Sequence, residues 1–133
     1  MSAPLRILVV DDDLLVKRTV AAALADVCAA QVWEARTGQE GLGLAALHRP
    51  DLILLDLDLP DMDGLAVCEA LRRDEQSVAI WILTGLAADQ DLIRAATRLA
   101  DRVIQKPISI VELSQAILER IVPHGPPLSW VGE

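Results

Sequence analysis

The sequence of 133 residues contains no phenylalanine, no tyrosine and only three tryptophans. Aromatic side chains therefore cannot fill its core, although 53% of the residues are hydrophobic. Leucine, isoleucine, valine and alanine must do so instead. A chain of this length can bury enough of them to fold as one domain without a metal or a disulfide to hold it together.

Cysteine is also scarce, since Cys28 and Cys68 are the only two. Both lie in segments of helical pattern, and neither has metal-ligand spacing or a nearby histidine, which argues against a zinc centre. We expect both to be small core residues. Free thiols of this kind suit a reducing cytoplasm.

The chain further lacks a long hydrophobic run and an excess of basic residues. No apolar run approaches the ~20 residues that span a membrane. The first residues carry Arg6 within a short apolar segment, followed by three aspartates, and do not have the pattern of a signal peptide. The formal net charge of −8 argues against unassisted nucleic-acid binding, because phosphates would repel it. We therefore expect a cytoplasmic protein without direct nucleic-acid or membrane contact.

Short apolar segments alternate with longer segments of helical spacing along the whole chain. The apolar segments predict strands at about residues 5–10, 31–35, 52–55, 78–83 and 102–105, the second of them an edge strand. The helical patterns cover about residues 14–26, 37–48, 65–74, 89–98 and 109–122. The expected apolar set of the last helix is Val111, Leu113, Ala116, Ile117 and Ile121.

Strict alternation of strands and helices requires a parallel sheet with helices on both faces, because each crossover is right-handed and covers one face. The predicted fold class is therefore α/β, with a five-stranded, doubly wound parallel sheet. Residues 1–122 form the predicted domain. Residues 123–133 hold three of the seven prolines and are expected to be a tail or linker.

The second predicted helix carries several local signals. Thr37 and Glu40 have the spacing of a capping box, in which each side chain accepts a free backbone N–H at the helix start. Gly41 and Gly43 should weaken this helix by about 1 kcal/mol each relative to alanine. We expect His48 to be a solvated residue at its carboxyl end.

Polar residues follow four of the five predicted strands. They are Asp11, Asp12 and Asp13 after the first, Asp56 and Asp58 after the third, Thr84 after the fourth and Lys106 after the fifth. One of the first three aspartates should also cap the helix that follows them. Because the carboxyl ends of parallel strands meet at one edge of a sheet, we expect these side chains to converge there.

Clustered carboxylates repel one another, and a hard divalent cation such as Mg²⁺ relieves that repulsion. A carboxylate beside such a cation can attack phosphorus and form an aspartyl-phosphate. A lysine ammonium and a hydroxyl would then neutralise and bond the phosphoryl oxygens. The residue types at these strand ends are those that phosphoryl transfer to a carboxylate requires.

The segments ILVVDDD, LLDLDLPDMDG, ILTG and QKP occur in an order that resembles the receiver domain of two-component response regulators, over about residues 5–122. The resemblance implies a flavodoxin-like sheet of strand order 2-1-3-4-5 and a phosphoryl acceptor at Asp56. It further implies Mg²⁺, replaceable by Mn²⁺, held by Asp12 and Asp56 directly, by Asp11 through water and by the backbone carbonyl of Asp58. By the same resemblance, Thr84 would bond the phosphoryl group and Lys106 would pair with it.

The resemblance also implies what the domain does. It would be a signalling domain of a phosphorelay rather than an enzyme, catalysing only its own phosphorylation and dephosphorylation. A histidine kinase or phosphotransfer protein would supply the phosphoryl group, and a downstream protein or an absent effector domain would receive the signal. A homodimer through the face of the fourth and fifth helices is a further option within the family.

The chain departs from the family pattern at several positions, Asp58 among them. Val103 stands where the family usually has an aromatic residue that moves inward on phosphorylation, and Leu99 stands where a glycine usually ends the fourth helix. The end of that helix is therefore expected to be rebuilt or longer. The carboxylate of Asp58 either faces the site and alters hydrolysis of the acyl phosphate, or faces solvent with only its carbonyl in use.

Two other interpretations are open at this point. The segment Asp56-Leu57-Asp58 also resembles the first motif of haloacid-dehalogenase-like phosphatases, although here the acidic pair precedes the nucleophile and a cap domain has no room. Alternatively, the chain is a phosphorylation-independent pseudo-receiver that serves only as an interaction module. Val103 and Leu99 favour that interpretation, and the complete set of aspartate, threonine and lysine opposes it.

Overall fold

The structure is a computed structural model that describes residues 4–25, 29–74, 77–85 and 89–121. Strands and helices alternate along the chain. They are β1 (Leu5–Val10), α1 (Leu14–Ala25), β2 (Ala30–Ala35), α2 (Gly38–His48), β3 (Leu52–Asp56), α3 (Gly64–Asp74), β4 (Ala79–Thr84), α4 (Gln90–Thr97), β5 (Arg102–Gln105) and α5 (Ile110–Ile121). None of the described helices is long and apolar enough to cross a membrane.

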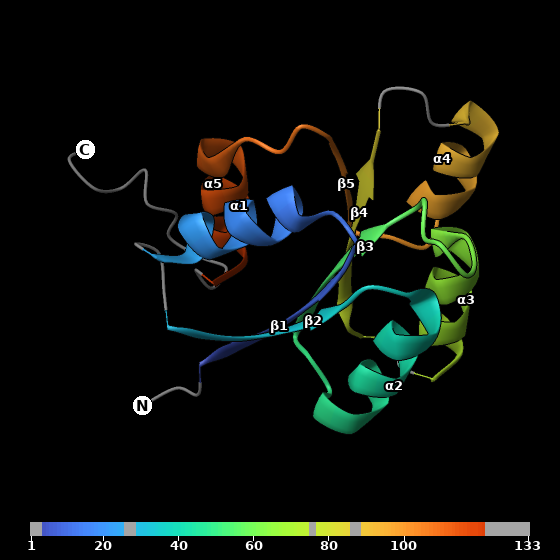
Figure 1. The fold of residues 1–133 in the computed structure, drawn as a ribbon, viewed down its shortest axis with the longest axis horizontal. Helices are drawn as coiled ribbons and strands as arrows, with labels where there is room; N and C mark the ends of the chain where they lie inside the picture. The colour runs from blue at the N-terminus through green and yellow to red at the C-terminus, as the bar shows by residue number, and fades with distance from the viewer. Residues whose placement is uncertain (1–3, 26–28, 75–76, 86–88, 122–133) are drawn as a thin grey trace.

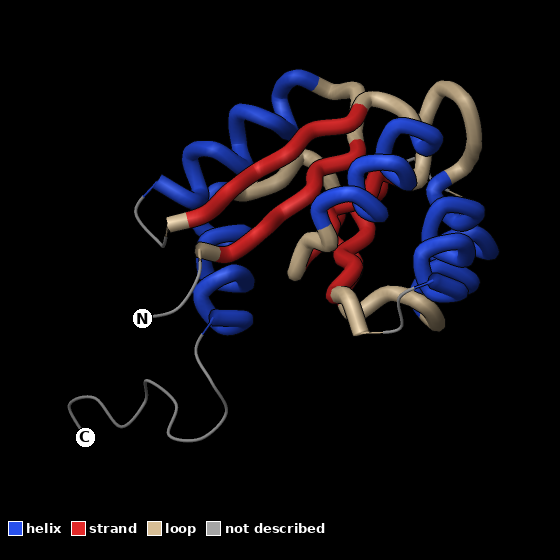
Figure 2. Tube along the Cα trace, turned by 90° about the horizontal axis from the view of Figure 1, so that it is seen from below, coloured by secondary structure: helices blue, strands red, loops and turns tan. Residues whose placement is uncertain are grey.

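The five strands form one sheet in the order β2-β1-β3-β4-β5, and every neighbouring pair is parallel. Helices α1 and α5 lie on one face and α2, α3 and α4 on the other (Figure 1). Seen from below, the strands lie between these two groups of helices (Figure 2). The predicted fold class and strand order are therefore confirmed, and β2 is an edge strand as expected.

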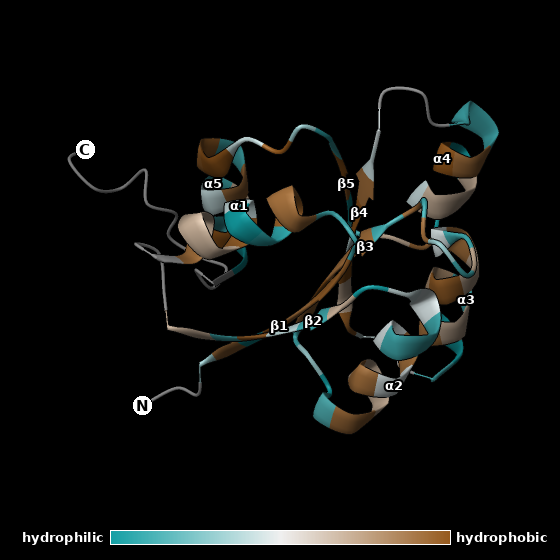
Figure 3. Cartoon of the chain, viewed as in Figure 1, coloured by the Kyte–Doolittle hydropathy of each residue, from teal (hydrophilic) through white to brown (hydrophobic). Residues whose placement is uncertain are grey.

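The central strand β3 contributes to a core on each face of the sheet. All five of its residues are buried. Leu52 and Leu54 belong to the cluster under α1 and α5, whereas Ile53 and Leu55 belong to the cluster under α3. Because both faces are covered, the strand sequence has no polar alternation, and the centre of the sheet is strongly hydrophobic (Figure 3).

Helix ends follow the predicted capping signals. The carboxylate of Asp13 accepts the N–H of Leu15 at 2.9 Å and so caps α1. The Thr37 hydroxyl accepts the N–H of Glu40 at 3.1 Å, and the Glu40 carboxylate accepts the N–H of Arg36 at 2.8 Å. These contacts confirm the cap before α1 and the cap by Thr37 before α2. Glu40 also accepts a free N–H at this helix start, but it is that of Arg36, one residue before the cap, rather than that of Thr37 as in a capping box.

Two local predictions were wrong. His48 is half-buried rather than solvated, because its ring stacks on Trp33 of β2 with centroids 4.3 Å apart. Val111 is 66% exposed, whereas Leu113, Ala116 and Ile117 form the buried face of α5. A residue two positions before Leu113 lies on the opposite side of a helix with 3.6 residues per turn.

The end of α4 is rebuilt rather than longer. The helix stops at Thr97, and the N–H groups of Leu99 and Ala100 both bond to the carbonyl of Ala96, at 3.0 and 2.9 Å. The chain thus turns toward β5 without a left-handed residue there, since the only described non-glycine residue with positive φ is Arg49.

Other predictions have mixed outcomes. Cys68 is fully buried in the core, as expected. In α2, a Cβ on Gly41 would lie 2.9 Å from a methyl of Val10, so this glycine permits close packing of the helix on the sheet. Cys28 and the predicted tail lie outside the described residues.

Candidate functional site

The carboxyl ends of the strands converge on a cluster of three carboxylates. Asp11 and Asp12 follow β1, and Asp56 ends β3. One carboxylate oxygen from each of these residues lies within 4.8 Å of the other two. Asp11 and Asp56 are buried and Asp12 is exposed, so the cluster opens to solvent on one side. This arrangement follows from the parallel pairing of β1 with β3.

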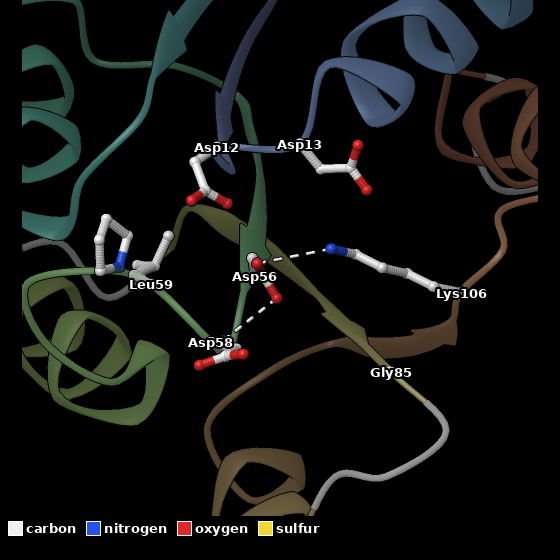
Figure 4. A pocket seen from close by; sticks show the side chains of 8 residues that line it. Asp12, Asp13, Asp56, Asp58, Leu59, Gly85 and Lys106 are labelled. Carbon is white, nitrogen blue, oxygen red and sulfur yellow. Dashed lines mark hydrogen bonds and ion pairs between the residues drawn. The ribbon is translucent and has the colours of Figure 1, made fainter.

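Lys106 places a positive charge against this cluster from the end of β5 (Figure 4). Its ammonium lies 2.9 Å from Oδ2 of Asp11 and 3.4 Å from Oδ2 of Asp56. The backbone N–H of Lys106 donates to the carbonyl of Thr84 at 2.7 Å, which fixes the start of the side chain beside β4. Burial lowers the pKa of Lys106, but its pairing with Asp11 and then Asp56 outweighs burial and raises the pKa overall.

Asp56 is 5% exposed, and its environment raises the pKa of its carboxyl group. Burial raises its pKa, the hydrogen bond from the N–H of Asp58 lowers it, and the charge of Asp11 raises it again. The net effect moves the pKa from 3.8 to about 6. The ammonium of Lys106 therefore offsets only part of the electrostatic cost of this buried carboxylate.

The backbone around Asp56 is closely packed against the start of α3. A Cβ built on Gly64 would lie 2.4 Å from the carbonyl oxygen of Asp56 and 2.6 Å from Cα of Leu57. The N–H of Gly64 donates to the carbonyl of Leu57 at 2.9 Å, and the N–H of Leu57 donates to the carbonyl of Leu83 at 3.2 Å. Only glycine fits at position 64 without displacing the peptide that carries the buried carboxylate.

A pocket of about 550 Å³ opens beside the cluster (Figure 4). Its lining residues are Asp12, Asp13, Asp56, Asp58, Leu59, Pro60, Gly85 and Lys106. Asp58 is exposed and lines this pocket, and its N–H donates to Oδ1 of Asp56 at 3.1 Å. Among the described residues that line this pocket, four are acidic and one, Lys106, is basic.

Thr84 lies beside this pocket without lining it. It is 5% exposed, and its hydroxyl is 3.4 Å from the carbonyl of Gly85, a long hydrogen bond. Sequence reasoning placed Thr84 in the site and did not place Leu59 and Pro60 there. Apolar loop residues carry no chemical signal, so only the three-dimensional path of the loop shows that they form a wall.

Comparison with known proteins agrees with this fold. The family model described as "Response regulator receiver domain" matches residues 7–118. The chain belongs to the family of response regulator receiver domains, the receiving domains of two-component signalling systems. The fold, the acidic cluster and the lysine at the end of β5 thus occur in a chain of the expected family.

The chain is similar to longer response regulators. It is 39% identical over 110 residues to the "DNA-binding dual master transcriptional regulator RpaA" of Synechocystis, covering 81% of this chain and 45% of that protein. It is 36% identical over 123 residues to the "Response regulator MprA" of Mycolicibacterium vanbaalenii, covering 90% and 53%. The chain spans about half the length of the curated relatives it matches.

Solved structures of similar fold include a CheY-like receiver domain protein from Methanospirillum hungatei, with a TM-score of 0.78, 28% identity, and coverage of 89% of this chain and 94% of that one. A response regulator structure from Chloroflexus aurantiacus has a TM-score of 0.77 and 27% identity, covering 88% and 97%. Both cover most of the receiver fold.

Proposed function

We propose that this chain accepts a phosphoryl group on Asp56 from a histidine kinase or phosphotransfer protein, with Mg²⁺, and that the modification changes its protein contacts. The observation that carries this proposal is the position of Asp56: it is buried among carboxylates, 3.4 Å from the ammonium of Lys106, at the base of an open pocket. In this role the chain modifies only itself and is not an enzyme acting on other substrates.

The acidic cluster fits a hard divalent cation. Three carboxylate oxygens within 4.8 Å of one another are the ligands that Mg²⁺ prefers. Burial first, and the charge of Asp11 after it, raise the pKa of Asp56, and a cation bound beside it would offset both effects. Asp12 and Asp56 would bind the ion directly, Asp11 through water, and the carbonyl of Asp58 would complete the protein ligands. Mg²⁺, or Mn²⁺ in its place, supplies positive charge to the phosphoryl oxygens when bound.

The chain's own residues account for the transfer. A carboxylate oxygen of Asp56 attacks phosphorus, an O–P bond forms, and the N–P bond of the phosphohistidine breaks with its electron pair retained by the imidazole. Lys106 already contacts Asp56 and so lies within reach of a phosphoryl oxygen. Among the described residues, the Thr84 hydroxyl bonds only to the carbonyl of Gly85, at a long 3.4 Å, and it can exchange this bond for one to a phosphoryl oxygen.

Apolar side chains next to the pocket support docking of a protein donor. Leu14 and Leu15 on α1 are 57% and 62% exposed, and Ile110 and Val111 on α5 are 48% and 66% exposed. Leu15, Ile110 and Val111 line a groove that also includes Asp13, a residue of the acidic pocket. A partner seated on this surface would present its phosphoryl group to Asp56.

The output would be a protein contact. Val103 of β5 is half-buried, pairs in register with Ile82 and packs in the cluster under α3 and α4. Its short side chain cannot move as a large aromatic would, so the response would pass through Thr84 and Lys106 alone. The relative RpaA is named as DNA-binding; for this acidic chain we propose a cytoplasmic location and no direct contact with nucleic acid. A homodimer through α4 and α5 is compatible with this output.

Intact-mass measurement after incubation with acetyl phosphate, with Mg²⁺ or with a chelator, tests the proposal. We expect a single phosphoryl adduct that requires Mg²⁺ and is absent in Asp56→Asn. No adduct in the wild type would favour a phosphorylation-independent interaction module. Continuous release of phosphate from phosphate esters would instead favour the phosphatase interpretation.

The role of Asp58 has its own test, because this residue lines the pocket with an exposed carboxylate. We propose that this carboxylate alters hydrolysis of the acyl phosphate by orienting water, or slows phosphorylation by adding negative charge. The lifetime of the adduct should therefore differ between the wild type and Asp58→Asn. An unchanged lifetime would mean that only the backbone of Asp58 takes part.

A further inference from the structure

The loop between β3 and α3 forms one wall of the acidic pocket. Asp58, Leu59 and Pro60 line that wall. Both ends of the loop are held by backbone contacts: Asp58 forms an isolated antiparallel bridge with Asp63, and the N–H of Gly64 bonds to the carbonyl of Leu57 at 2.9 Å. These contacts hold the two ends of the loop together, but they do not fix the position of its middle residues.

Asp61 fastens the middle of the loop to a different element, α2. Its Oδ1 accepts the N–H of Gly38 at 2.7 Å, and its Oδ2 accepts the N–H of Gln39 at 3.0 Å. These two N–H groups are at the start of α2, where no carbonyl of the helix can reach them. The same two bonds hold the pKa of Asp61 below its ordinary value, so the side chain is ionised at neutral pH.

Packing at the same place brings the loop close to the helix. A Cβ built on Gly38 would lie 2.5 Å from Cγ and 2.7 Å from Sδ of Met62, and 2.8 Å from a methyl of Val67. Any larger residue at position 38 would therefore displace the side chain of Met62, the residue next to Asp61, at the point where the loop packs on α2. The Thr37 hydroxyl meets a separate need of the helix, since it accepts the N–H of Glu40.

We infer that Asp61 is a positioning residue for the acidic site: by fastening the loop to α2, it holds the wall formed by Asp58, Leu59 and Pro60. This inference rests on the proposed Mg²⁺-dependent function, because the loop supplies the carbonyl of Asp58 that would complete the ligands. Asp61 itself does not line the pocket. It acts from outside the site, as outer partners of metal ligands do.

The first experiment measures the affinity for Mg²⁺ alone by titration calorimetry. Asp61→Ala should weaken binding roughly tenfold, the lower end of what loss of an outer partner costs metal sites. Thr37→Ala removes another cap of the same helix and should leave the affinity unchanged. Asp63→Asn removes a nearby negative charge from the same loop, while the side-chain oxygen that caps α3 is kept. This control separates loss of the bonds between Asp61 and α2, which form the tether, from loss of electrostatic attraction for the cation.

A second pair of variants disturbs the tether without changing any charge. Gly38→Ala should weaken Mg²⁺ binding, because its methyl group displaces Met62. Gly43→Ala on the same helix is the matched control, since a Cβ there meets nothing within 4 Å. Amide hydrogen exchange gives a readout that needs no metal: Asp58, Leu59 and Asp61 should exchange faster in Gly38→Ala than in Gly43→Ala, and exchange at the same rate in both would overturn the inference.

The outcomes for the inference and for the proposed function are distinct. If the wild type binds Mg²⁺ and Asp61→Ala binds it equally well, the inference is wrong and the proposed function stands. Equal weakening by Asp61→Ala and Asp63→Asn would assign the effect to charge and would also overturn the inference. A wild type that binds no Mg²⁺ would overturn both.

Discussion

Asp56 is a buried carboxylate whose neighbours change its proton affinity in opposite directions. Burial raises its pKa, the N–H of Asp58 lowers it, and the charge of Asp11 raises it, with a net value of about 6. In the protein without metal, this residue is therefore destabilising when ionised. Such a residue makes the free energy of unfolding depend on pH and on whatever cation binds beside it.

Asp56→Asn should stabilise the metal-free protein at neutral pH. Because the folded-state pKa lies above the ordinary value of 3.8, ionisation of Asp56 lowers stability as pH rises from about 4 to 6. The variant lacks this loss, so it should be more stable than the wild type by at most about 3 kcal/mol above pH 6. Urea unfolding at several pH values in the presence of chelator measures this difference.

The same measurement has a clear contrary result. The difference between Asp56→Asn and the wild type should shrink toward zero as pH falls to about 4, where both side chains are neutral. A variant that is less stable than the wild type at pH 7, or a difference that does not change with pH, would contradict the raised pKa. Exposed carboxylates contribute equally to both proteins and cancel in the comparison.

At the scale of single residues, sequence reasoning succeeds where the topology brings strand ends together. Asp11, Asp56 and Lys106 could be grouped because parallel strands end at one edge of the sheet. Asp61 could not be assigned to the start of α2, because its partners lie 22 and 23 positions away and no periodicity links a loop to a helix end. The stacking of His48 on Trp33 was missed for the same reason.

At the scale of elements, Arg72 of α3 joins three segments at the edge of the sheet opposite the site. Its side chain is 17% exposed, and its guanidinium donates to the carbonyls of Leu99 and Val78 and to the carboxylate of Asp101. The same carboxylate accepts the N–H of Ile80 at 2.9 Å. Arg72 thereby holds the turn after α4, where no left-handed residue ends the helix.

Arg72→Ala should lower the free energy of unfolding by about 2–4 kcal/mol, because it leaves two carbonyls and a carboxylate without their charged donor. Arg94→Ala is the matched control, since Arg94 forms an exposed ion pair with Asp91 on α4. Such a pair contributes at most about 1 kcal/mol. Equal losses in the two variants, measured by urea unfolding, would contradict the role given to Arg72.

Element positions were predictable because the periodicities differ clearly. Strand β3 has no polar alternation and is buried along its whole length, as predicted. Helix α1 buries Val16, Val20 and Leu24, the residues that its helical spacing places on one face. Element ends were less predictable. The apolar residue Val111 was assigned to the buried face of α5 by hydrophobicity, although the angular position of Leu113 places it on the solvent side.

At the scale of the whole molecule, a chain of net charge −8 concentrates part of that charge around one pocket. Binding of a divalent cation there should raise the melting temperature, because a ligand that binds only the folded state stabilises it by mass action. At a Mg²⁺ concentration 100 times the dissociation constant, the gain is about 2.7 kcal/mol. Thermal unfolding with and without Mg²⁺, at constant ionic strength, measures it.

Asp12→Asn provides the control for that measurement. Asp12 is exposed and its charge repels those of Asp11 and Asp56, so the substitution should leave the metal-free protein at least as stable as the wild type. It removes one of the three clustered carboxylates, and the stabilisation by Mg²⁺ should fall with it. A gain that persists in Asp12→Asn would mean that the cation acts elsewhere on the acidic surface.

The close packing of Gly64 against the backbone of Asp56 and Leu57 prevents the peptide that carries the buried carboxylate from shifting toward α3. Its strand lies in the middle of the sheet, bonded to β1 on one side and β4 on the other. The backbone of Asp56 is therefore held in place, and the repulsion caused by a charge added to its side chain cannot be relieved by a shift of that backbone. The conformational response to such a charge has to come from the groups around Asp56. Lys106 is the first of these, because its ammonium is attracted to added negative charge at Asp56.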